Sequence, residues 1–442
     1  MIRFIVTVVL ATLLAAACVG PGATSVPSSS PSPSATQSSS PTATATASAS
    51  PLTGWRLVTI PPPVAERWPT PTAVAAGGGR LVAVGGPVHP EGTIEGPMYG
   101  TIWTSADGLA WTAVGLDPIL EVGAGRPTSG PEPGFSEVAY GPGGFVVLGH
   151  EMTDQGIRVG IWRSETGEAW ERVHVPQAVF DGGRPAAVTA GGPGYVIVGG
   201  WLDPDAPRDG VAPPRAAVWT SPDGDAWIRV RDQDGFAVGG YIDTGETPDA
   251  GGMLDVTPTE AGLVAVGRTC KGVNLMEDPM GLVSSCRPLI WTSENGTKWT
   301  RVDPDLPAHP GNVSFIAAAG ARIAAVGGGW SDDPAVRYTL RSGDGTTWRW
   351  DEDSASSPFE GIVAIRGTLM ATSHETGQVG LWASTTGATW TAVADVPSMS
   401  KGPSVRESDV VALDDRVVVV GWREGEEDSA QAGFAIVGPL GR

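Results

Sequence analysis

The sequence predicts an all-β fold, a β-propeller of seven four-stranded antiparallel blades, on the strength of two repeated patterns. One is a short apolar strand bounded by glycine or a small polar residue, which occurs seven times: 80–86, 144–150, 194–200, 262–268, 322–328, 368–374 and 416–422. The other is the spacing Ser-x-x-Gly-x-x-Trp, here called the box. It occurs six times, ending at Trp111, Trp170, Trp227, Trp299, Trp348 and Trp390.

Each repeat contains the same order of segments. An apolar run precedes the glycine-bounded strand, an Ile-Trp or Leu-Trp strand leads into the box, and a Trp-x-x-Val run or a close relative follows it. These runs are rich in β-branched and aromatic residues and are punctuated by Gly and Pro, which is typical of strands. One unit is therefore strand a, a tight turn, strand b, a loop, strand c, the box, and strand d.

The number of blades follows from what is left over at the two ends. The seventh unit continues into AGFAIVG (432–438) as strand c and then lacks a strand d, whereas GWRLV (54–58) has the form of a strand d with no a, b or c before it. We expect the N-terminal strand to complete the last blade. Such a closure also covers two strand edges that would otherwise be free to aggregate.

The boxes raise the question of whether their acidic residue is chemical or structural. Its place is filled by Asp107, Thr166, Asp223, Asn295, Asp344 and Thr386. All six have a side-chain oxygen that can bond nearby backbone N–H groups, but threonine and asparagine lack the carboxylate that an acidic or nucleophilic role at this place would need. We therefore predict that the boxes are turns, in which glycine takes a positive φ and the closing Trp packs between blades.

Ser-x-Asp-Gly-x-x-Trp resembles the Asp-box, or BNR repeat, of sialidases and related propellers, shortened by one residue before the glycine. The resemblance covers six of the seven units and implies the fold more than an activity. Sialidase activity would need three arginines, a Tyr–Glu pair and an Asp. The family's Phe/Tyr-Arg-Ile-Pro stretch is missing, and the corresponding region reads GWRLVTIPPP. No catalytic residue is carried over.

The first fifty-three residues indicate export and anchoring. Residues 1–17 have the form of a secretory signal. LLAAAC, ending at Cys18, resembles a bacterial lipobox, with Leu14 one place earlier than usual, and the resemblance implies lipidation of Cys18. Residues 18–53 form a disordered Ser/Thr/Pro tether in this interpretation. We expect the propeller, residues 54–442, to be extracytoplasmic and held at the outer face of the cell membrane; plain secretion is the alternative.

The composition restricts the partners. The formal net charge is −20, so nucleic acid is not expected as a ligand, and contact with a membrane is expected only through the N-terminal lipid. We expect a monomer that binds a cell-surface glycan or protein. Runs such as DQD (232–234) and DED (351–353) predict an acidic surface.

A ligand is expected on the face that carries the long b–c and d–a loops, because variable loops on a regular scaffold usually hold function. The candidate ligand-binding residues follow strand b: His150, Glu151, Trp201, Arg268, Trp330, His374, Glu375, Trp422 and Arg423. A His/Glu pair can ligate metal and exposed Trp can stack on sugar rings, although anchoring of loops is the simpler interpretation. We predict neither a metal site nor a cofactor.

Cys270 and Cys286 lie in the longest b–c insertion, and in an extracytoplasmic protein we expect them to form a disulfide. Taken together, the sequence predicts a cell-surface lipoprotein that binds a glycan or protein without catalysis. The alternative is a glycoside hydrolase of the Asp-box type, either exo-sialidase-like or of another specificity, because many carboxylates are available.

Overall fold

The structure is a computed structural model. It describes residues 54–440 except 65–69, 90–95, 126–130, 204–214, 239–250, 271–285, 305–311, 329–336, 353–358, 376–377, 398–404 and 425–430. The chain divides into two units, residues 1–48 and 49–442, and everything described below belongs to the second. Within these residues no helix is long and apolar enough to cross a membrane.

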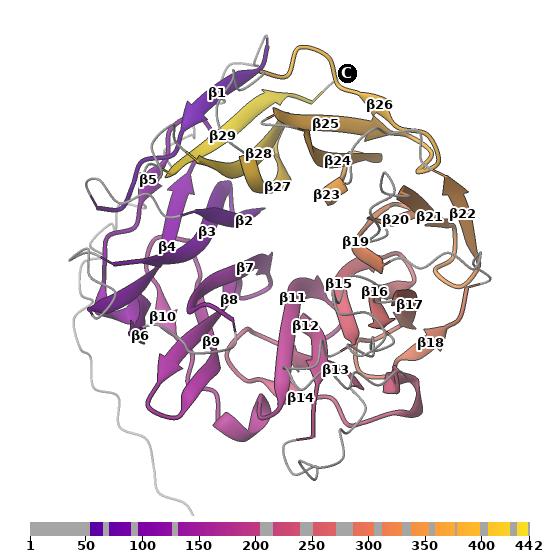
Figure 1. Cartoon of the computed structure of the whole chain (residues 1–442), viewed down its shortest axis with the longest axis horizontal. Helices are drawn as coiled ribbons and strands as arrows, with labels where there is room; N and C mark the ends of the chain where they lie inside the picture. The colour runs from indigo at the N-terminus through magenta and orange to yellow at the C-terminus, as the bar shows by residue number, and fades with distance from the viewer. Residues whose placement is uncertain are drawn as a thin grey trace, which may run out of the picture. The chain divides into compact units, whose positions relative to one another are not determined.

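Seven antiparallel sheets form a ring, as predicted, so the protein is a seven-bladed β-propeller (Figure 1). The innermost strands are β2 (Pro71–Gly77), β7 (Gly134–Gly141), β11 (Gly183–Gly191), β15 (Gly252–Thr259), β19 (Asn312–Ala319), β23 (Phe359–Ile365) and β27 (Val405–Leu413). The second strands are β3 (Arg80–Val88), β8 (Gly144–Thr153), β12 (Gly194–Trp201), β16 (Gly262–Cys270), β20 (Arg322–Gly328), β24 (Thr368–Glu375) and β28 (Arg416–Glu424). Blades are numbered 1 to 7 in this order.

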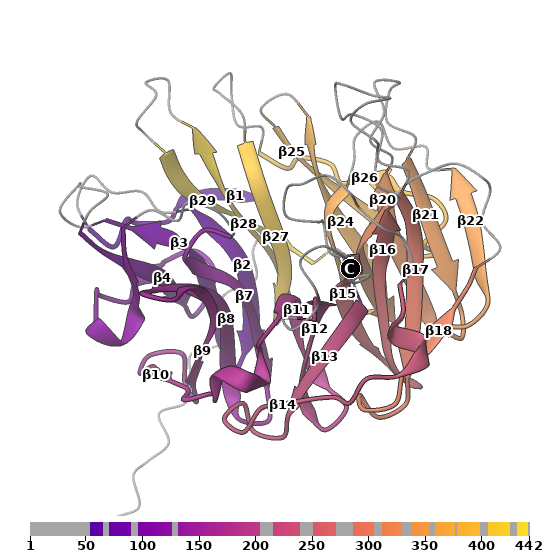
Figure 2. The ribbon, with the colours of Figure 1, turned by 60° about the horizontal axis from the view of Figure 1, so that its bottom comes forward.

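The third strands are β4 (Pro97–Ser105), β9 (Gly156–Ser164), β13 (Arg215–Ser221), β17 (Cys286–Ser293), β21 (Arg337–Ser342), β25 (Gln378–Ser384) and β29 (Gln431–Pro439). The outermost strands are β5 (Thr112–Ala113), β10 (Glu171–Arg172), β14 (Ile228–Arg229), β18 (Thr300–Val302), β22 (Trp348–Glu352), β26 (Thr391–Ala392) and β1 (Arg56–Thr59). Figure 2 shows one complete blade, β15 to β18, obliquely.

The closure of the ring is confirmed. Strand β1 pairs antiparallel with β29, with Arg56 opposite Val437 and Thr59 opposite Phe434 (Figure 1). The pairing continues past the strand, because the N–H of Ile60 donates to the carbonyl of Gly433 at 3.0 Å. The N-terminal strand therefore completes blade 7 and covers the outer edge of β29.

The core consists of seven clusters of buried apolar side chains, and each cluster fills the space between two neighbouring blades. Alternation along strand b explains this arrangement. In β3, Val82 and Val84 face blade 2, while Leu81 and Ala83 face blade 7. Because both faces of each blade are covered, strand b is a continuous apolar run, and each fully buried Val or Leu contributes roughly 1.5–3 kcal/mol.

The outermost strands are shorter than the Trp-x-x-Val runs suggested, since several contain only two residues. The valine nevertheless keeps its backbone bond: the N–H of Val173 donates to Ile161 at 2.9 Å and that of Val230 to Val218 at 2.8 Å. The sequence did not predict β6 (Glu121–Ala124), which pairs with residues 97–99 of β4, the part of that strand left uncovered by β5.

Three short 3₁₀ helices lie between consecutive blades: η1 (Pro118–Leu120), η2 (Gln177–Val179) and η3 (Asp234–Phe236). Each is anchored by a buried tryptophan of a third strand, whose indole N–H donates at 2.7 Å to a carbonyl of the helix. The pairs are Trp162 with Ile119, Trp219 with Val179, and Trp291 with Gly235. These connections are therefore fixed parts of the scaffold.

Candidate functional site

The boxes are turns whose polar groups bond to one another, as predicted. In all six, the serine Oγ accepts the glycine N–H at 2.8 Å. All six glycines have a φ between +75° and +85°, which is the left-handed region that favours glycine. The serine hydroxyl thus satisfies a backbone donor that the tight turn would leave buried and unpaired.

The third position of the box, which varies among Asp, Asn and Thr, accepts backbone N–H groups of the same turn, as its residue types predict. The Oδ1 of Asp223 accepts the N–H groups of Asp225 and Ala226 at 2.9 and 3.1 Å. These bonds lower the pKa of Asp223. Asn295 accepts the equivalent pair at 2.9 and 3.0 Å. A carboxylate is therefore not required at this place.

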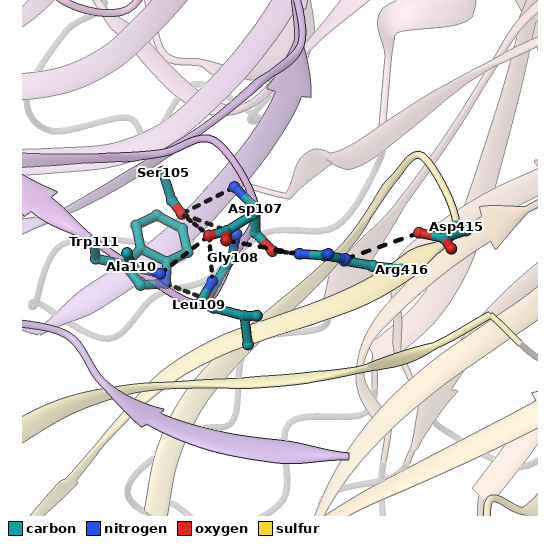
Figure 3. A network of polar contacts seen from close by, with 8 residues as sticks. All are labelled: Ser105, Asp107, Gly108, Leu109, Ala110, Trp111, Asp415 and Arg416. Carbon is teal, nitrogen blue, oxygen red and sulfur yellow. Dashed lines mark hydrogen bonds and ion pairs between the residues drawn. The ribbon is translucent and has the colours of Figure 1, made fainter. Parts of the chain in front are cut away.

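The box of blade 1 also shows how neighbouring blades are joined (Figure 3). Arg416, at the start of β28 in blade 7, is 5% exposed and donates to the carbonyl of Asp107 at 2.7 Å. The closing Trp111 belongs to the cluster between blades 7 and 1, and its indole N–H donates to the carbonyl of Gly108 at 2.8 Å. The closing Trp thus packs between blades, as predicted, and the box end of the propeller is a scaffold.

The opposite end contains a cavity of about 1040 Å³ between blades 2 and 3. It is lined by Pro131, the end of β8, the start of β9, Arg172 of β10 and the residues after it, the η2 connection, the start of β11, and Leu202 and Asp203 after β12. These are the b–c and d–a sides of the two blades, which is the face where the sequence placed a ligand. The cavity is at the upper end of the range for small-ligand sites.

Glu151 is the buried charge of this cavity. It is 3% exposed, and its Oε2 accepts hydrogen bonds from Arg158, at 3.0 Å, and from Arg172. Its other oxygen, Oε1, is buried with no hydrogen-bond partner in the structure. One carboxylate therefore holds two guanidinium groups against the wall of the cavity. Both arginine side chains keep substantial exposure, 50% for Arg158 and 37% for Arg172.

His150, next to Glu151, also lines the cavity. Burial lowers its pKa to about 4, because desolvation disfavours the charged imidazolium. The ring is consequently neutral at physiological pH. His174 lines the same cavity and is exposed. Among the residues that the structure describes, no group of three His, Cys, Asp or Glu is arranged to hold a metal ion.

Trp201 lies near the cavity, but one face of its ring is covered. The guanidinium of Arg229 is 4.0 Å from the ring centroid, a cation–π contact, and the indole N–H donates to the carbonyl of Asp181 at 2.9 Å. Trp422 is 9% exposed, and Arg268 is half-buried and engaged in an interaction. Only Arg423 of the remaining placed candidates is exposed.

Several predicted residues lie outside what the structure describes. Cys18 and Trp330 are in this group, as are the side chains of His374 and Glu375, whose backbone forms the end of β24. Cys270 and Cys286 are register partners where β16 meets β17, but their side chains are likewise outside the described part. The disulfide stays a prediction.

The arginines of the cavity were missed in the sequence although a signal was present. The hairpin of β8 and β9 turns through two residues after Thr153, which places Glu151 directly opposite Arg158.

The acidic surface expected from the Asp runs is partly neutralised by arginines: Asp232 pairs with Arg215 and Asp303 with Arg301, both at 2.9 Å.

Three further carboxylates occupy one repeat position on the inner strands: Glu137, Asp255 and Asp409. Glu137 and Asp255 come directly after a β-bulge, and Asp409 comes one residue later. Asp255 accepts the N–H of Ile316 in the next blade at 2.8 Å, and Asp409 accepts that of Val74 at 2.9 Å. Burial raises the pKa of Asp255 to about 7 and that of Asp409 to about 6. Burial, and then the charges of Asp409 and Asp255, raise the pKa of Glu137.

No family model matches the sequence, and no curated protein matches it. Many solved structures share its fold. The polysaccharide lyase Uly1 superposes with a TM-score of 0.53 at 8% identity, covering 84% of this chain and 90% of that one. YCF48 bound to D1 peptide gives 0.50 at 12%, covering 88% and 98%. Trypanosoma rangeli sialidase in complex with sialic acid gives 0.42 at 12%, covering 89% and 60%. At these identities the likeness shows the propeller fold alone.

Proposed function

We propose that this protein is a non-catalytic binding module that takes its ligand into the cavity between blades 2 and 3. The observation that carries the proposal is the pair of arginines held over this cavity by the buried Glu151. Two preorganised, partly exposed guanidinium groups provide directional donors to a ligand. The peptide bound by the fold neighbour YCF48 is consistent with a protein or peptide partner, and a cell-surface glycan is the other partner expected from the sequence.

The composition of the cavity favours binding over hydrolysis. A glycoside hydrolase needs two carboxyl groups about 5–10 Å apart, one of which donates a proton. In the described lining, the carboxylate on the blade 2 wall is Glu151, and it is bonded to two guanidinium groups. Asp181 and Asp203, on the blade 3 side, are exposed. This arrangement does not provide a protonated acid facing a base.

Two measurements on the purified protein test the proposal. The first is binding to a panel of peptides and oligosaccharides, compared with His174→Trp, a change at an exposed lining residue that narrows the cavity. We expect the variant to lose binding and keep its fold by circular dichroism. The second is turnover of a fluorogenic glycoside panel, which we expect to be absent. Turnover abolished by replacing a carboxylate of the propeller would establish the hydrolase instead.

The proposal includes attachment to the cell surface through a lipid on Cys18. The support comes from the sequence of residues 1–53, namely the signal, the lipobox-like segment and the uncharged tether. In a bacterial host we expect the wild-type chain to incorporate labelled palmitate and to fractionate with membranes, and Cys18→Ser to do neither. A wild-type chain found unlabelled in the medium would favour plain secretion.

A further inference from the structure

The donors of Arg158 and Arg172 are only partly used. Both guanidinium groups bond to the same oxygen, Oε2 of Glu151. A guanidinium carries five N–H donors, so in the described part of the cavity each arginine keeps further N–H groups for a ligand. Because Glu151 is buried and fixed, these donors are held in place before a ligand arrives, which lowers the entropic cost of binding.

The charge of this wall is also out of balance. On the blade 2 wall, one carboxylate faces two guanidinium groups, which leaves one positive charge there, and the neighbouring His150 is neutral because burial lowers its pKa to about 4. On the blade 3 side, Asp181 and Asp203 accompany Arg184, so the positive charge belongs to the blade 2 wall. The whole chain has 48 acidic and 28 basic residues, so a positive wall is unusual for its surface. Arginine forks match the planar, two-oxygen geometry of a carboxylate. The wall is thus complementary to a carboxylate-bearing ligand.

The remaining lining favours a peptide over a sugar. Beside the arginines lie aliphatic side chains, including Ile157, Val159 and Val175. Sugar sites usually offer an open aromatic face for stacking. The aromatic ring of the described lining, Phe180, is 8% exposed and packs on Trp219 with centroids 5.1 Å apart, and Trp201 is covered by Arg229.

We infer that the cavity binds a peptide segment through a carboxylate, either a C-terminal carboxylate or an Asp or Glu side chain, which Arg158 and Arg172 hold while the aliphatic wall takes the neighbouring side chains. This inference rests on the proposed function, because it specifies the ligand of the same cavity.

The test uses a random heptapeptide array, synthesised once with free C-termini and once as amides, and probed with the purified protein. Hits are then measured in solution by fluorescence anisotropy. Neutral and uronic-acid oligosaccharides serve as the glycan probes. The variants are Arg158→Gln, Arg172→Gln and the double variant. Arg163→Gln is the matched control, since Arg163 also lies on β9 and pairs with Glu171 at 2.5 Å but does not line the cavity.

We expect hits that carry a carboxylate, about tenfold weaker binding for each single arginine variant and about a hundredfold weaker binding for the double variant, because each variant loses charged hydrogen bonds to the ligand. Arg163→Gln should bind like the wild type. Hits confined to the free-acid array would identify the C-terminal carboxylate, and hits on both arrays that contain Asp or Glu would identify a side chain.

Neutral peptides that bind with full affinity to the double variant yet not to His174→Trp would overturn the carboxylate inference and leave the binding function intact. A uronic-acid oligosaccharide bound through both arginines would overturn the inference that the ligand is a peptide, and would leave the recognition of a carboxylate intact. Binding of every probe unaffected by His174→Trp, or no binding at all, would overturn both the inference and the proposed use of the cavity.

Discussion

At the box end of the propeller, polar side chains bond to the backbone of their own turn or of the next blade, as Ser105 and Arg416 do. At the opposite end, Arg158 and Arg172 line a cavity and keep N–H donors beyond those bonded to Glu151. The difference reflects the repeat itself. The box turn recurs six times and satisfies its polar groups with the same hydrogen bonds each time. The loops of a single pair of blades, by contrast, can carry charged residues that the other blades lack.

The comparison predicts that changes at the box end act on stability and leave binding alone. The largest effect is expected at a closing Trp. Trp299 is 3% exposed and packs in the cluster between blades 3 and 4, so Trp299→Ala should lower the free energy of unfolding by about 3–5 kcal/mol through the cavity it leaves. Urea denaturation would measure this change.

Trp170 is the matched control. It closes the box of blade 2 in the same way, with its indole N–H donating to the carbonyl of Gly167 at 3.1 Å, but it is only partly buried. Trp170→Ala should therefore cost less than Trp299→Ala. Equal losses at the two positions would mean that burial between blades is not what the closing Trp contributes.

Carboxylates sharpen the comparison, because burial raises the pKa of the inner-strand acids whereas backbone bonds lower that of Asp223 in a box. A raised pKa means that the native state binds protons more tightly than the unfolded chain. The stability lost should therefore grow as pH rises from about 4, reaching about 4 kcal/mol for Asp255 near pH 7 and about 3 kcal/mol for Asp409 near pH 6, and it should return on acidification. Urea midpoints between pH 4.5 and 8 would show this slope.

Glu137→Gln isolates the inner-strand effect. Burial, and then the charges of Asp409 and Asp255, disfavour the charged form of Glu137, so removing its charge should raise stability at pH 8 by about 1 kcal/mol or more and have less effect at pH 5. Glu165→Gln, an exposed box residue of the same blade, should change neither value. A destabilised Glu137→Gln at pH 8 would contradict the inner-strand account.

A middle-sized effect is expected at the box serine. Ser221 is fully buried and accepts the N–H of Gly224 at 2.8 Å. Ser221→Ala leaves that donor unpaired, at a cost of about 1–3 kcal/mol. Ser384→Ala in blade 6 removes the same bond and should cost a similar amount. Thermal unfolding of the two variants would check this, and a neutral result at both would show that water replaces the hydroxyl.

The fold could be predicted from the sequence because one strand pattern recurs seven times. The number of blades followed because the N-terminal segment has the form of a strand d, which the last repeat lacks. β6 could not be predicted, since EVGA has no counterpart in the other blades and forms only to cover the edge of β4. The sequence pointed to part of the cavity's lining. His150 and Glu151 stood out after strand b, but Arg172 comes from a separate strand, and sequence alternation does not show that its side chain reaches Glu151.

The smallest expected effect addresses the acid of the box directly. Asp223→Asn should change the free energy of unfolding by no more than about 0.5 kcal/mol, because Asn295 occupies the same place in blade 4 and accepts the same two N–H groups. Asp223→Ala, which removes the acceptor, should be the less stable of the two. Ligand binding should be unchanged in both, since Asp223 lies at the end of the blade away from the cavity. A loss of binding in Asp223→Asn with normal stability would give the box a functional role and remove the contrast between the two ends.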